Sequence, residues 1–410
     1  MYVPREIEYN INKWLKEREI IAIIGPRQSG KTTLLHHIQD QLIKNCMYDP
    51  EHIIYASFDD EIERLKFEKN FKDYIEGKII DNNPHLFLLD EVQYLENAGS
   101  RLKVIFDKYH DIIKFIITGS CSLDIRNIGG SLVGRAVFFE LYPFSFQEFL
   151  LAKDPKLNKY YIQNRFDFTK NYSIKKLVYL DELNHLLKEY ISFGGFPRIA
   201  LLDDFEKKKF LLGQLVTLYI EKDILKLYGQ TFRNDALKIL QYLAFHCGQL
   251  LNFEDISSHL KIEIRRVNEV INILENTFII KLIRPYYKSL ATELRKRPKT
   301  FFIDSGIRNV LAEDFVFSSE KGIAFESFVF SQLNRAKKHL KYWRTTSKAE
   351  VDFIYDGIPI EVKITPKITR SLQSYITTYS PPITVIANYE TIEKQERKNS
   401  VIFYIPVSLL

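Results

Sequence analysis

The stretch that most constrains this sequence is Gly25-Pro26-Arg27-Gln28-Ser29-Gly30-Lys31-Thr32, which fits the pattern G-x-x-x-x-G-K-[ST]. An apolar run, Glu19–Ile24, precedes it, and a helical run, Thr33–Gln41, follows it. A strand, a glycine-rich loop and a helix in this order aim loop amides and a helix N-terminus at phosphates. We predict that these eight residues and Thr33 bind ATP. Lys31 would reach the β/γ-phosphates, and the Thr32 hydroxyl would hold Mg²⁺.

The first 150 residues alternate short apolar runs with helical stretches. Runs of this length, continuous in apolar residues, are typical of strands buried on both faces. Their alternation with helices predicts a parallel α/β sheet, the core of a P-loop NTPase, over residues 1–150. The predicted strands are Glu19–Ile24, Ile53–Phe58, Leu86–Leu89 and Lys114–Thr118.

Two acids follow the third of these strands. Asp90 and Glu91 directly follow Leu86–Leu89, so Asp90 is expected at the carboxyl end of a buried strand beside the loop. There Asp90 would support Mg²⁺, and Glu91 would orient or deprotonate the attacking water. The plainer alternative is an acid pair that caps the next helix.

The fourth strand ends in Thr118-Gly119-Ser120. We predict that Thr118 and Ser120 contact nucleotide and that one hydroxyl senses the γ-phosphate; a plain strand-ending turn is the alternative. An arginine can complete such a site by neutralising transition-state charge. Arg135 is the first candidate and Arg126 the second, and either could equally be a surface arginine without a catalytic role.

The charge is unevenly divided along the 410 residues. The net charge is +6, with −5 in residues 1–150 and +11 in residues 151–410. A basic second part favours a polyanionic partner there. The three cysteines are too far apart for a disulfide or zinc framework. With no signal peptide visible and no apolar run near the roughly 18 residues of a membrane helix, we expect a cytoplasmic protein without membrane contact.

Residues 151–230 read as a helical lid or linker, interrupted at Gly194–Pro197, and residues 231–300 as a winged helix. Helices are predicted at Asn234–Cys247, Phe253–Leu260 and Ile264–Asn276, then a β-hairpin wing around the basic segment Lys288–Pro298. In a helix-turn-helix the third helix enters the major groove, and a basic wing suits phosphates. A protein-docking module with a solvated basic loop is the alternative. The predicted DNA contacts are Arg265, Arg266, Lys288, Arg295, Lys296 and Arg297.

Residues 301–410 read as a mixed α/β domain that contains a carboxylate–lysine pattern. A helix around Glu326 precedes a strand carrying Asp352, the turn Asp356-Gly357, and a strand carrying Glu361-Val362-Lys363. Carboxylates beside a lysine can bind Mg²⁺ and activate water against a phosphodiester. The pattern resembles the PD-(D/E)xK nuclease core, with Asp352, Glu361 and Lys363 at the motif positions and Glu326 as the helix acid, although Val351 replaces the usual proline. That resemblance implies a restriction-endonuclease-like fold, either cutting or inactive; a surface salt-bridge cluster is the plainer alternative.

Taken together, the motifs resemble a large prokaryotic family of AAA-type ATPases fused to a C-terminal domain of uncharacterised function. The resemblance rests on the P-loop, Asp90-Glu91, Thr118-Gly119-Ser120, the segment 131–149 (SLVGRAVFFELYPFSFQEF), Gly194–Pro197 and the C-terminal motifs. It implies ATP hydrolysis and a homo-oligomer in which a neighbour supplies the arginine. We therefore expect an ATP-driven machine that acts on DNA. The alternative is a nucleotide-switched signalling NTPase with an inactive nuclease-like fold and no DNA partner.

Overall fold

The computed structural model describes residues 2–120, 130, 132–174, 177–219, 230–287, 289–315, 322–336, 339–397 and 400–410. The chain forms two compact units. The first comprises Met1–Pro143 with Asn276–Phe278, and the second Phe144–Glu275 with Ile279–Leu410. The four segments predicted from the sequence are thus distributed over two compact units. Arg126 and Lys288, both named as candidates above, lie outside the described residues.

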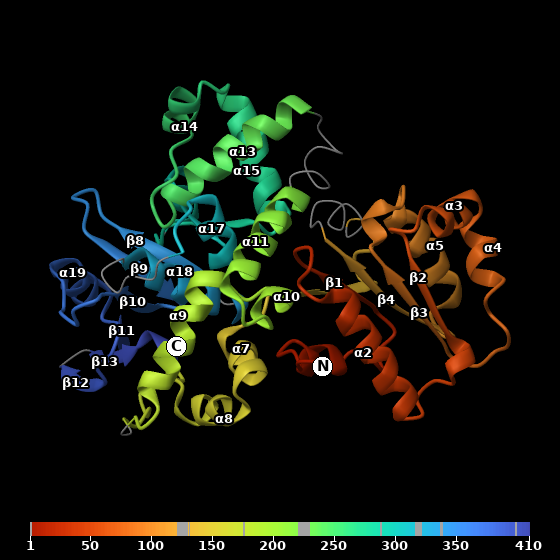
Figure 1. The fold of residues 1–410 in the computed structure, drawn as a ribbon, viewed down its shortest axis with the longest axis horizontal. Helices are drawn as coiled ribbons and strands as arrows, with labels where there is room; N and C mark the ends of the chain where they lie inside the picture. The colour runs from red at the N-terminus through yellow and green to blue at the C-terminus, as the bar shows by residue number, and fades with distance from the viewer. Residues whose placement is uncertain are drawn as a thin grey trace. The chain divides into compact units, whose positions relative to one another are not determined.

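The first unit is built on a five-stranded parallel sheet in the order β2-β3-β4-β1-β5 (Figure 1). The four predicted strands are confirmed to within a residue or two at each end. The fifth strand, which we did not predict, is an edge strand whose run Ala136–Phe139 is apolar, although only Phe139 is buried. The bounds are β1 Ile20–Ile24, β2 Ile53–Ser57, β3 His85–Asp90, β4 Ile113–Gly119 and β5 Ala136–Glu140.

Helix α2 (Lys31–Lys44) packs against this sheet through Leu34, Leu35, Ile38 and Leu42. These side chains meet alternate residues of β1, β3 and β4, because side chains of a strand point to opposite faces in turn. The central strands are buried on both faces, as a parallel sheet requires. The other helices of this unit are α1 Glu8–Asn12, α3 Glu61–Lys69, α4 Phe71–Glu76 and α5 Ala98–Tyr109.

The second unit begins with helices, as predicted. A capping box starts the first helix: the Ser145 hydroxyl accepts from the Glu148 backbone N–H, and the Glu148 carboxylate accepts from that of Ser145. The helices are α7 Phe146–Lys153, α8 Pro155–Asn164, α9 Leu180–Phe193, α10 Pro197–Ala200, α11 Phe205–Tyr219, α13 Gln230–Phe245, α14 Phe253–Leu260, α15 Ile264–Asn276 and α17 Ser305–Leu311.

The break between α9 and α10 is fixed by a buried carboxylate. Gly194 has φ +75°, and the Asp304 carboxylate accepts hydrogen bonds from the backbone N–H groups of Gly195, Gly306 and Ile307. A Cβ on Gly194 would lie 2.0 Å from Asp304 Oδ1. Burial raises the pKa of Asp304 to about 6, although the three N–H groups oppose the shift. The glycine pair therefore lets this turn approach the start of α17.

The predicted β-hairpin wing is partly wrong. Strands β6 (Ile280–Ile283) and β7 (Lys299–Phe302) do pair antiparallel, but the connection contains a short helix, α16 (Leu290–Arg295). Glu293 holds this helix in place, because its carboxylate accepts from Lys341 Nζ at 2.6 Å and from the Tyr287 backbone N–H at 3.0 Å. The wing was predicted from the spacing of basic residues, which does not reveal a contact between residues 48 positions apart.

The last hundred residues form a mixed six-stranded sheet in the order β12-β13-β11-β10-β9-β8 (Figure 1). The predicted hairpin is confirmed: β9 and β10 pair antiparallel across Asp356-Gly357, both of which have positive φ. Strand β10 then runs parallel to β11. The bounds are α18 Gly322–Leu333, β8 Leu340–Arg344, β9 Glu350–Tyr355, β10 Ile358–Val362, α19 Arg370–Tyr379, β11 Ile383–Asn388, β12 Glu393–Arg397 and β13 Ser400–Pro406.

Candidate nucleotide site and carboxylate cluster

The glycine-rich loop joins β1 to α2 at the carboxyl edge of the first sheet. Gly30 has φ +97° and Gln28 has φ +59°, so the loop alternates into left-handed conformations. Such a loop turns successive backbone N–H groups toward one side and forms an anion-binding concavity. At Gly25 a Cβ would lie 2.1 Å from the Leu141 carbonyl oxygen, which explains the first glycine. The Ser29 hydroxyl is buried and has no hydrogen-bond partner among the described residues. These features fit a phosphate group.

Lys31 is buried, and its ammonium group points into the loop. Its Nζ donates to the carbonyl oxygens of Gly25 and Pro26, both at 3.1 Å, and lies 3.9 Å from Glu91 Oε1. A buried ammonium group needs anionic partners. A bound phosphate chain would supply such partners where the loop carbonyls now serve.

Thr32 and Asp90 lie side by side. The Thr32 hydroxyl donates to Asp90 Oδ2 at 2.7 Å, and the Tyr55 hydroxyl donates to the same oxygen at 3.2 Å. The Thr118 hydroxyl donates to the other oxygen of Asp90. Burial and the Asp90 carboxylate raise the pKa of Tyr55 to about 12, so Tyr55 stays a donor. Hydroxyl and carboxylate oxygens are the ligands that Mg²⁺ prefers, so this pair fits the metal of a metal–nucleotide complex.

Glu91 occupies a left-handed backbone conformation, with φ 56° and ψ 46°. Its carboxylate faces Lys31 and accepts from the Ser120 hydroxyl at 2.6 Å and from the Gln93 side-chain amide. Burial alone would raise the pKa of Glu91, but Lys31, Ser120 and Gln93 together lower it below its usual value. Glu91 is therefore an ionised base at neutral pH, held at a strained backbone position of the kind found at functional sites.

The Asp90–Glu91 pair does not act as a simple helix cap. Neither side chain caps the short 3₁₀ turn Val92–Tyr94 that follows. Thr118 instead bridges the pair, because its hydroxyl donates to Asp90 and accepts from the Glu91 backbone N–H at 3.0 Å. The structure thus brings together Lys31, Thr32, Asp90, Glu91, Thr118 and Ser120. Their roles toward a nucleotide remain predictions.

Arg135 lies at the amino ends of the strands, opposite the P-loop. It directly precedes β5, and Ala136 of β5 pairs with Ile20, the first residue of β1. The P-loop instead follows the last residue of β1. The five residues of β1, at about 3.3 Å each, separate the amino ends of the strands from the P-loop. The side chain of Arg135 is too short to span that distance. Arg135 instead pairs with Asp107 at 2.5 Å. Its side chain therefore does not reach the P-loop of its own chain.

Besides Tyr55, two further residues of this site were missed by the sequence analysis. Gln93 donates from its amide to Glu91 and, at 3.1 Å, to the Ser120 hydroxyl. Arg5 is buried, and its guanidinium donates to the Ser29 carbonyl at 2.8 Å and to that of Tyr142 at 2.5 Å. Arg5 thereby fixes the back of the P-loop. Neither residue belongs to a local motif, so only tertiary contacts reveal them.

The C-terminal cluster also assembles. Lys363 Nζ lies 3.4 Å from Asp352 Oδ2 and 3.3 Å from Glu361 Oε1. The Thr369 hydroxyl donates to Glu361 Oε1 at 2.9 Å, whereas Glu361 Oε2 is buried without a hydrogen-bond partner among the described residues. Burial and the Asp352 charge raise the pKa of Glu361 to about 7, against the opposing Lys363. An uncompensated buried carboxylate oxygen fits a cation ligand.

Glu326 reaches the same region from α18 and lines a cavity of about 530 Å³. Its pKa is raised to about 8 by burial and by Asp352, with Lys299 and Lys363 opposing. The wall also contains Asp352, Glu350, Lys299 and Arg344. In the described part of the chain, however, Glu326, Asp352 and Glu361 do not form a group of three side chains placed to hold a metal ion as they stand.

The predicted DNA contacts are only partly accessible. Arg265 is exposed on α15 and pairs with Glu269 at 3.3 Å, whereas Arg266 lies over the Phe232 ring and 3.8 Å from Asp235. Arg295, Lys296 and Arg297 are exposed, and Arg297 lies 3.8 Å from Glu254. Within the same basic stretch, Lys299 is buried in a 2.6 Å ion pair with Glu350. The exposed basic group is therefore the end of α16 and the two residues after it.

Residues 17–150 match the family described as an AAA domain (AAA_14). Together with the five-stranded parallel sheet and the P-loop, this match identifies an AAA-type ATPase domain in the first part of the chain. Residues 184–316 and 321–410 match two domains of unknown function, DUF8612 and DUF4143.

Similar proteins span most of the chain. An uncharacterized protein of Haemophilus influenzae is 28% identical over 352 residues, which cover 83% of this chain and 80% of that protein. Another, from Methanocaldococcus jannaschii, is 28% identical over 370 residues, covering 87% of this chain and 75% of that protein.

Solved structures resemble the chain only weakly. The Aeropyrum pernix ORC1 protein in complex with DNA has a TM-score of 0.35 at 11% identity, covering 76% of this chain and 94% of that one. Thermotoga maritima RuvB has a TM-score of 0.34 at 15% identity, covering 68% and 89%. At TM-scores this low, the likeness carries no weight for function. In the described part of the chain, no helix has the length and apolar character needed to cross a bilayer.

Proposed function

We propose that this chain hydrolyses ATP at the P-loop and uses the energy to act on DNA through its second unit. The observation that carries the ATPase proposal is the convergence of Lys31, the Thr32–Asp90 pair and Glu91 at one edge of the sheet. Lys31 would hold the β/γ-phosphates, and Thr32 and Asp90 would hold Mg²⁺, which would neutralise charge on the phosphates. Glu91 would orient and deprotonate the attacking water.

We further propose that the protein works as a homo-oligomer. The position of Arg135 supports this, because the sheet separates it from the P-loop of its own chain. In an assembly, Arg135 of one subunit would neutralise charge at the nucleotide of its neighbour. The Asp107 carboxylate would release it or continue to orient it.

The DNA part of the proposal rests on charge and on the C-terminal cluster. The exposed group Arg295, Lys296 and Arg297 suits phosphate contacts. Helix α18 precedes β8, β9 and β10, and α19 lies between β10 and β11; this order of elements supports the resemblance to a PD-(D/E)xK nuclease core. Asp352, Glu361 and Lys363 occupy its motif positions, and the unpartnered Glu361 oxygen supports a Mg²⁺ site at which water could attack a phosphodiester.

The alternative is a signalling NTPase whose C-terminal unit binds a protein partner. The ion pairs that Arg265, Arg266 and Arg297 already make within the chain favour it. The discriminating experiment measures ATP turnover with and without duplex, branched and single-stranded DNA, at several salt concentrations. ATP turnover that DNA stimulates, together with salt-dependent DNA binding, supports the ATPase that acts on DNA. No stimulation and no salt-dependent binding would favour the signalling NTPase.

A further inference from the structure

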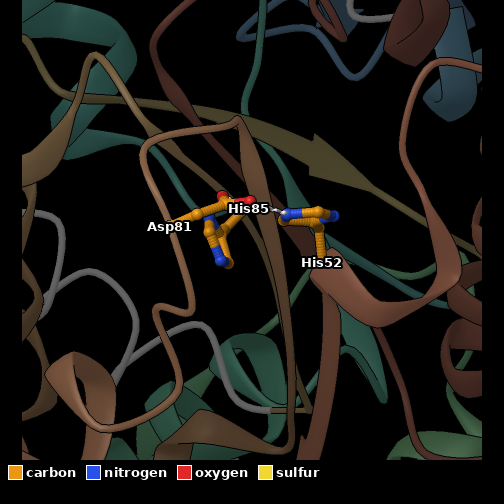
Figure 2. Close-up of side chains that lie close together, drawn as sticks. All are labelled: His52, Asp81 and His85. Atoms are coloured by element: carbon orange, nitrogen blue, oxygen red, sulfur yellow. Dashed lines mark hydrogen bonds and ion pairs between the residues drawn. The ribbon is translucent and has the colours of Figure 1, made fainter.

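Two buried histidines and an aspartate lie together at the amino ends of the strands of the first sheet, opposite the P-loop. His52 directly precedes β2, and His85 is the first residue of β3. Because Ile53 pairs with Leu86, the residues before them, His52 and His85, also lie beside each other. Their ring centroids are 4.8 Å apart, and Asp81 comes from the loop that leads into β3 (Figure 2).

The ligand atoms of these three residues all lie within 4.8 Å of one another. His52 Nε2 is 3.0 Å from Asp81 Oδ1 and 3.1 Å from Oδ2. Two ligands of a tetrahedral zinc ion, each about 2.0–2.1 Å from the metal, are about 3.3 Å apart. The His52–Asp81 separation is thus close to that of two zinc ligands, and His85 needs a closure of at most about 1.5 Å.

The second nitrogen of each histidine faces an oxygen atom. His85 Nδ1 lies 2.7 Å from the Asn83 carbonyl oxygen, and His52 Nδ1 lies 3.9 Å from Asp49 Oδ2. Histidines that ligate metals usually donate their other N–H to a carbonyl or carboxylate, which fixes the ring and leaves Nε2 basic. At present His85 Nε2 accepts from the Ile80 backbone N–H at 3.2 Å, a contact that a metal would replace.

We propose that His52, Asp81 and His85 bind one divalent transition-metal ion, zinc by preference, at this edge of the sheet. Two imidazole nitrogens and one carboxylate suit zinc and are a poor set for Mg²⁺, which prefers oxygen. Both histidines are buried, whereas the Asp81 side chain is 42% exposed and gives a path from solvent. Three protein ligands leave the fourth position to water. The ion joins the loop before β3 to the start of β2 and stabilises the ATPase unit without entering the nucleotide site.

The plainer account is that Asp81 only accepts a hydrogen bond from His52. A titration of the full, untagged, chelator-stripped chain with Zn²⁺ in excess Mg²⁺ separates the two, with Co²⁺ absorption as a second readout of nitrogen ligation. We expect about one Zn²⁺ per chain, with binding at least ~10-fold weaker in His52→Gln and His85→Gln, and a zinc-dependent rise in melting temperature that is smaller in these two variants than in the wild type. The control His185→Gln removes an exposed histidine of α9 and should bind as the wild type does.

Either histidine variant could fold poorly, so Asp81→Asn is the decisive one. It keeps the size of a partly exposed side chain and one acceptor oxygen for the Asn83 backbone N–H, so its melting temperature in chelator should stay close to that of the wild type. We expect it to bind Zn²⁺ about 10-fold more weakly. A wild-type chain that binds no Zn²⁺ below ~100 μM, or an Asp81→Asn chain that binds it as tightly as wild type, overturns the proposal. Neither result depends on ATP turnover, so the metal site and the ATPase proposal fail separately.

Discussion

The Thr32 hydroxyl donates a 2.7 Å hydrogen bond to the Asp90 carboxylate across 58 positions of the chain. Strand β4 lies between the strands that lead to these residues, because the sheet order is β2-β3-β4-β1-β5. The neighbours of β1 in the sheet are therefore β4 and β5, and not β2, the strand that follows it in the chain. Ligands of open α/β sheets bind beside such a break in the strand order, at the carboxyl ends of the strands. The proposed metal–nucleotide site occupies that position.

Replacing Lys31 with alanine should abolish ATP turnover. The β/γ-phosphates would lose the buried ammonium group of the loop, and the other cation of the P-loop, Arg27, donates to the Tyr94 hydroxyl instead. Phosphate release from ATP is the measurement. Lys44→Ala, which removes an exposed lysine from the end of the same helix, should turn over ATP as the wild type does. Retained turnover in Lys31→Ala would show that the hydrolytic site is elsewhere.

Glu91→Gln should slow hydrolysis about 10²–10⁴-fold and leave nucleotide binding intact, because a general base contributes that much. Single-turnover hydrolysis and fluorescent-nucleotide binding separate the two effects. Gln93→Ala should slow hydrolysis less, since it removes only one donor that positions Glu91. The exposed Glu96 provides the matched control, Glu96→Gln. Equal turnover of wild type and Glu91→Gln would refute the assignment of the base.

Arg135→Ala should reduce turnover by about 10³-fold or more if Arg135 serves a neighbouring subunit. Mixing Arg135→Ala with Lys31→Ala chains should restore part of the activity, because one chain contributes an intact P-loop and the other an intact arginine. Asp107→Asn, which removes the partner that Arg135 now has, should not lower turnover. Full turnover by Arg135→Ala alone would assign the arginine to the surface ion pair.

Any Mg²⁺-dependent nicking by this chain should be lost in the double variant Asp352→Asn, Lys363→Ala, with ATP turnover unchanged. Nicking should also rise with pH between about 6 and 8. The pKa of Glu361 is raised to about 7 and that of Glu326 to about 8, so both are protonated in acid and gain the charge that Mg²⁺ needs as the pH rises. Supercoiled plasmid relaxation measures both effects, and the exposed Lys367→Ala is the control. Nicking that persists in the double variant belongs to another site.

Gly194→Ala should destabilise the second unit by at least about 2 kcal/mol. The alanine Cβ would meet the buried Asp304 carboxylate at 2.0 Å, and the backbone φ of +75° is strained for any other residue. Gly213→Ala is the opposite control, because Gly213 lies in α11 with open space around it, and alanine favours helices by up to about 1 kcal/mol. Urea unfolding measures both, and the two changes should have opposite signs.

Much of the nucleotide site was predictable because its signals are local. The glycines, Lys31 and Thr32 are neighbours in sequence, and Asp90 follows a continuous apolar run of strand length. Gln93 and Arg5 carry no such signal. Gln93 acts through a turn that places Glu91 in a left-handed conformation, and Arg5 reaches Ser29 from 24 positions earlier in the chain.

The sequence by itself determined the strand–loop–helix unit, the order of the sheet's buried strands along the chain, and the Asp356-Gly357 hairpin, because periodicity and turn chemistry act over a few residues. Only the tertiary structure decided the rest. Strand pairing in a parallel sheet brings His52 to His85 and sends Arg135 to the edge opposite the P-loop. A single long-range ion pair, Lys341 with Glu293, holds a helix where the basic spacing predicted a wing. Such contacts depend on which distant segments pack together, and local sequence does not encode that choice.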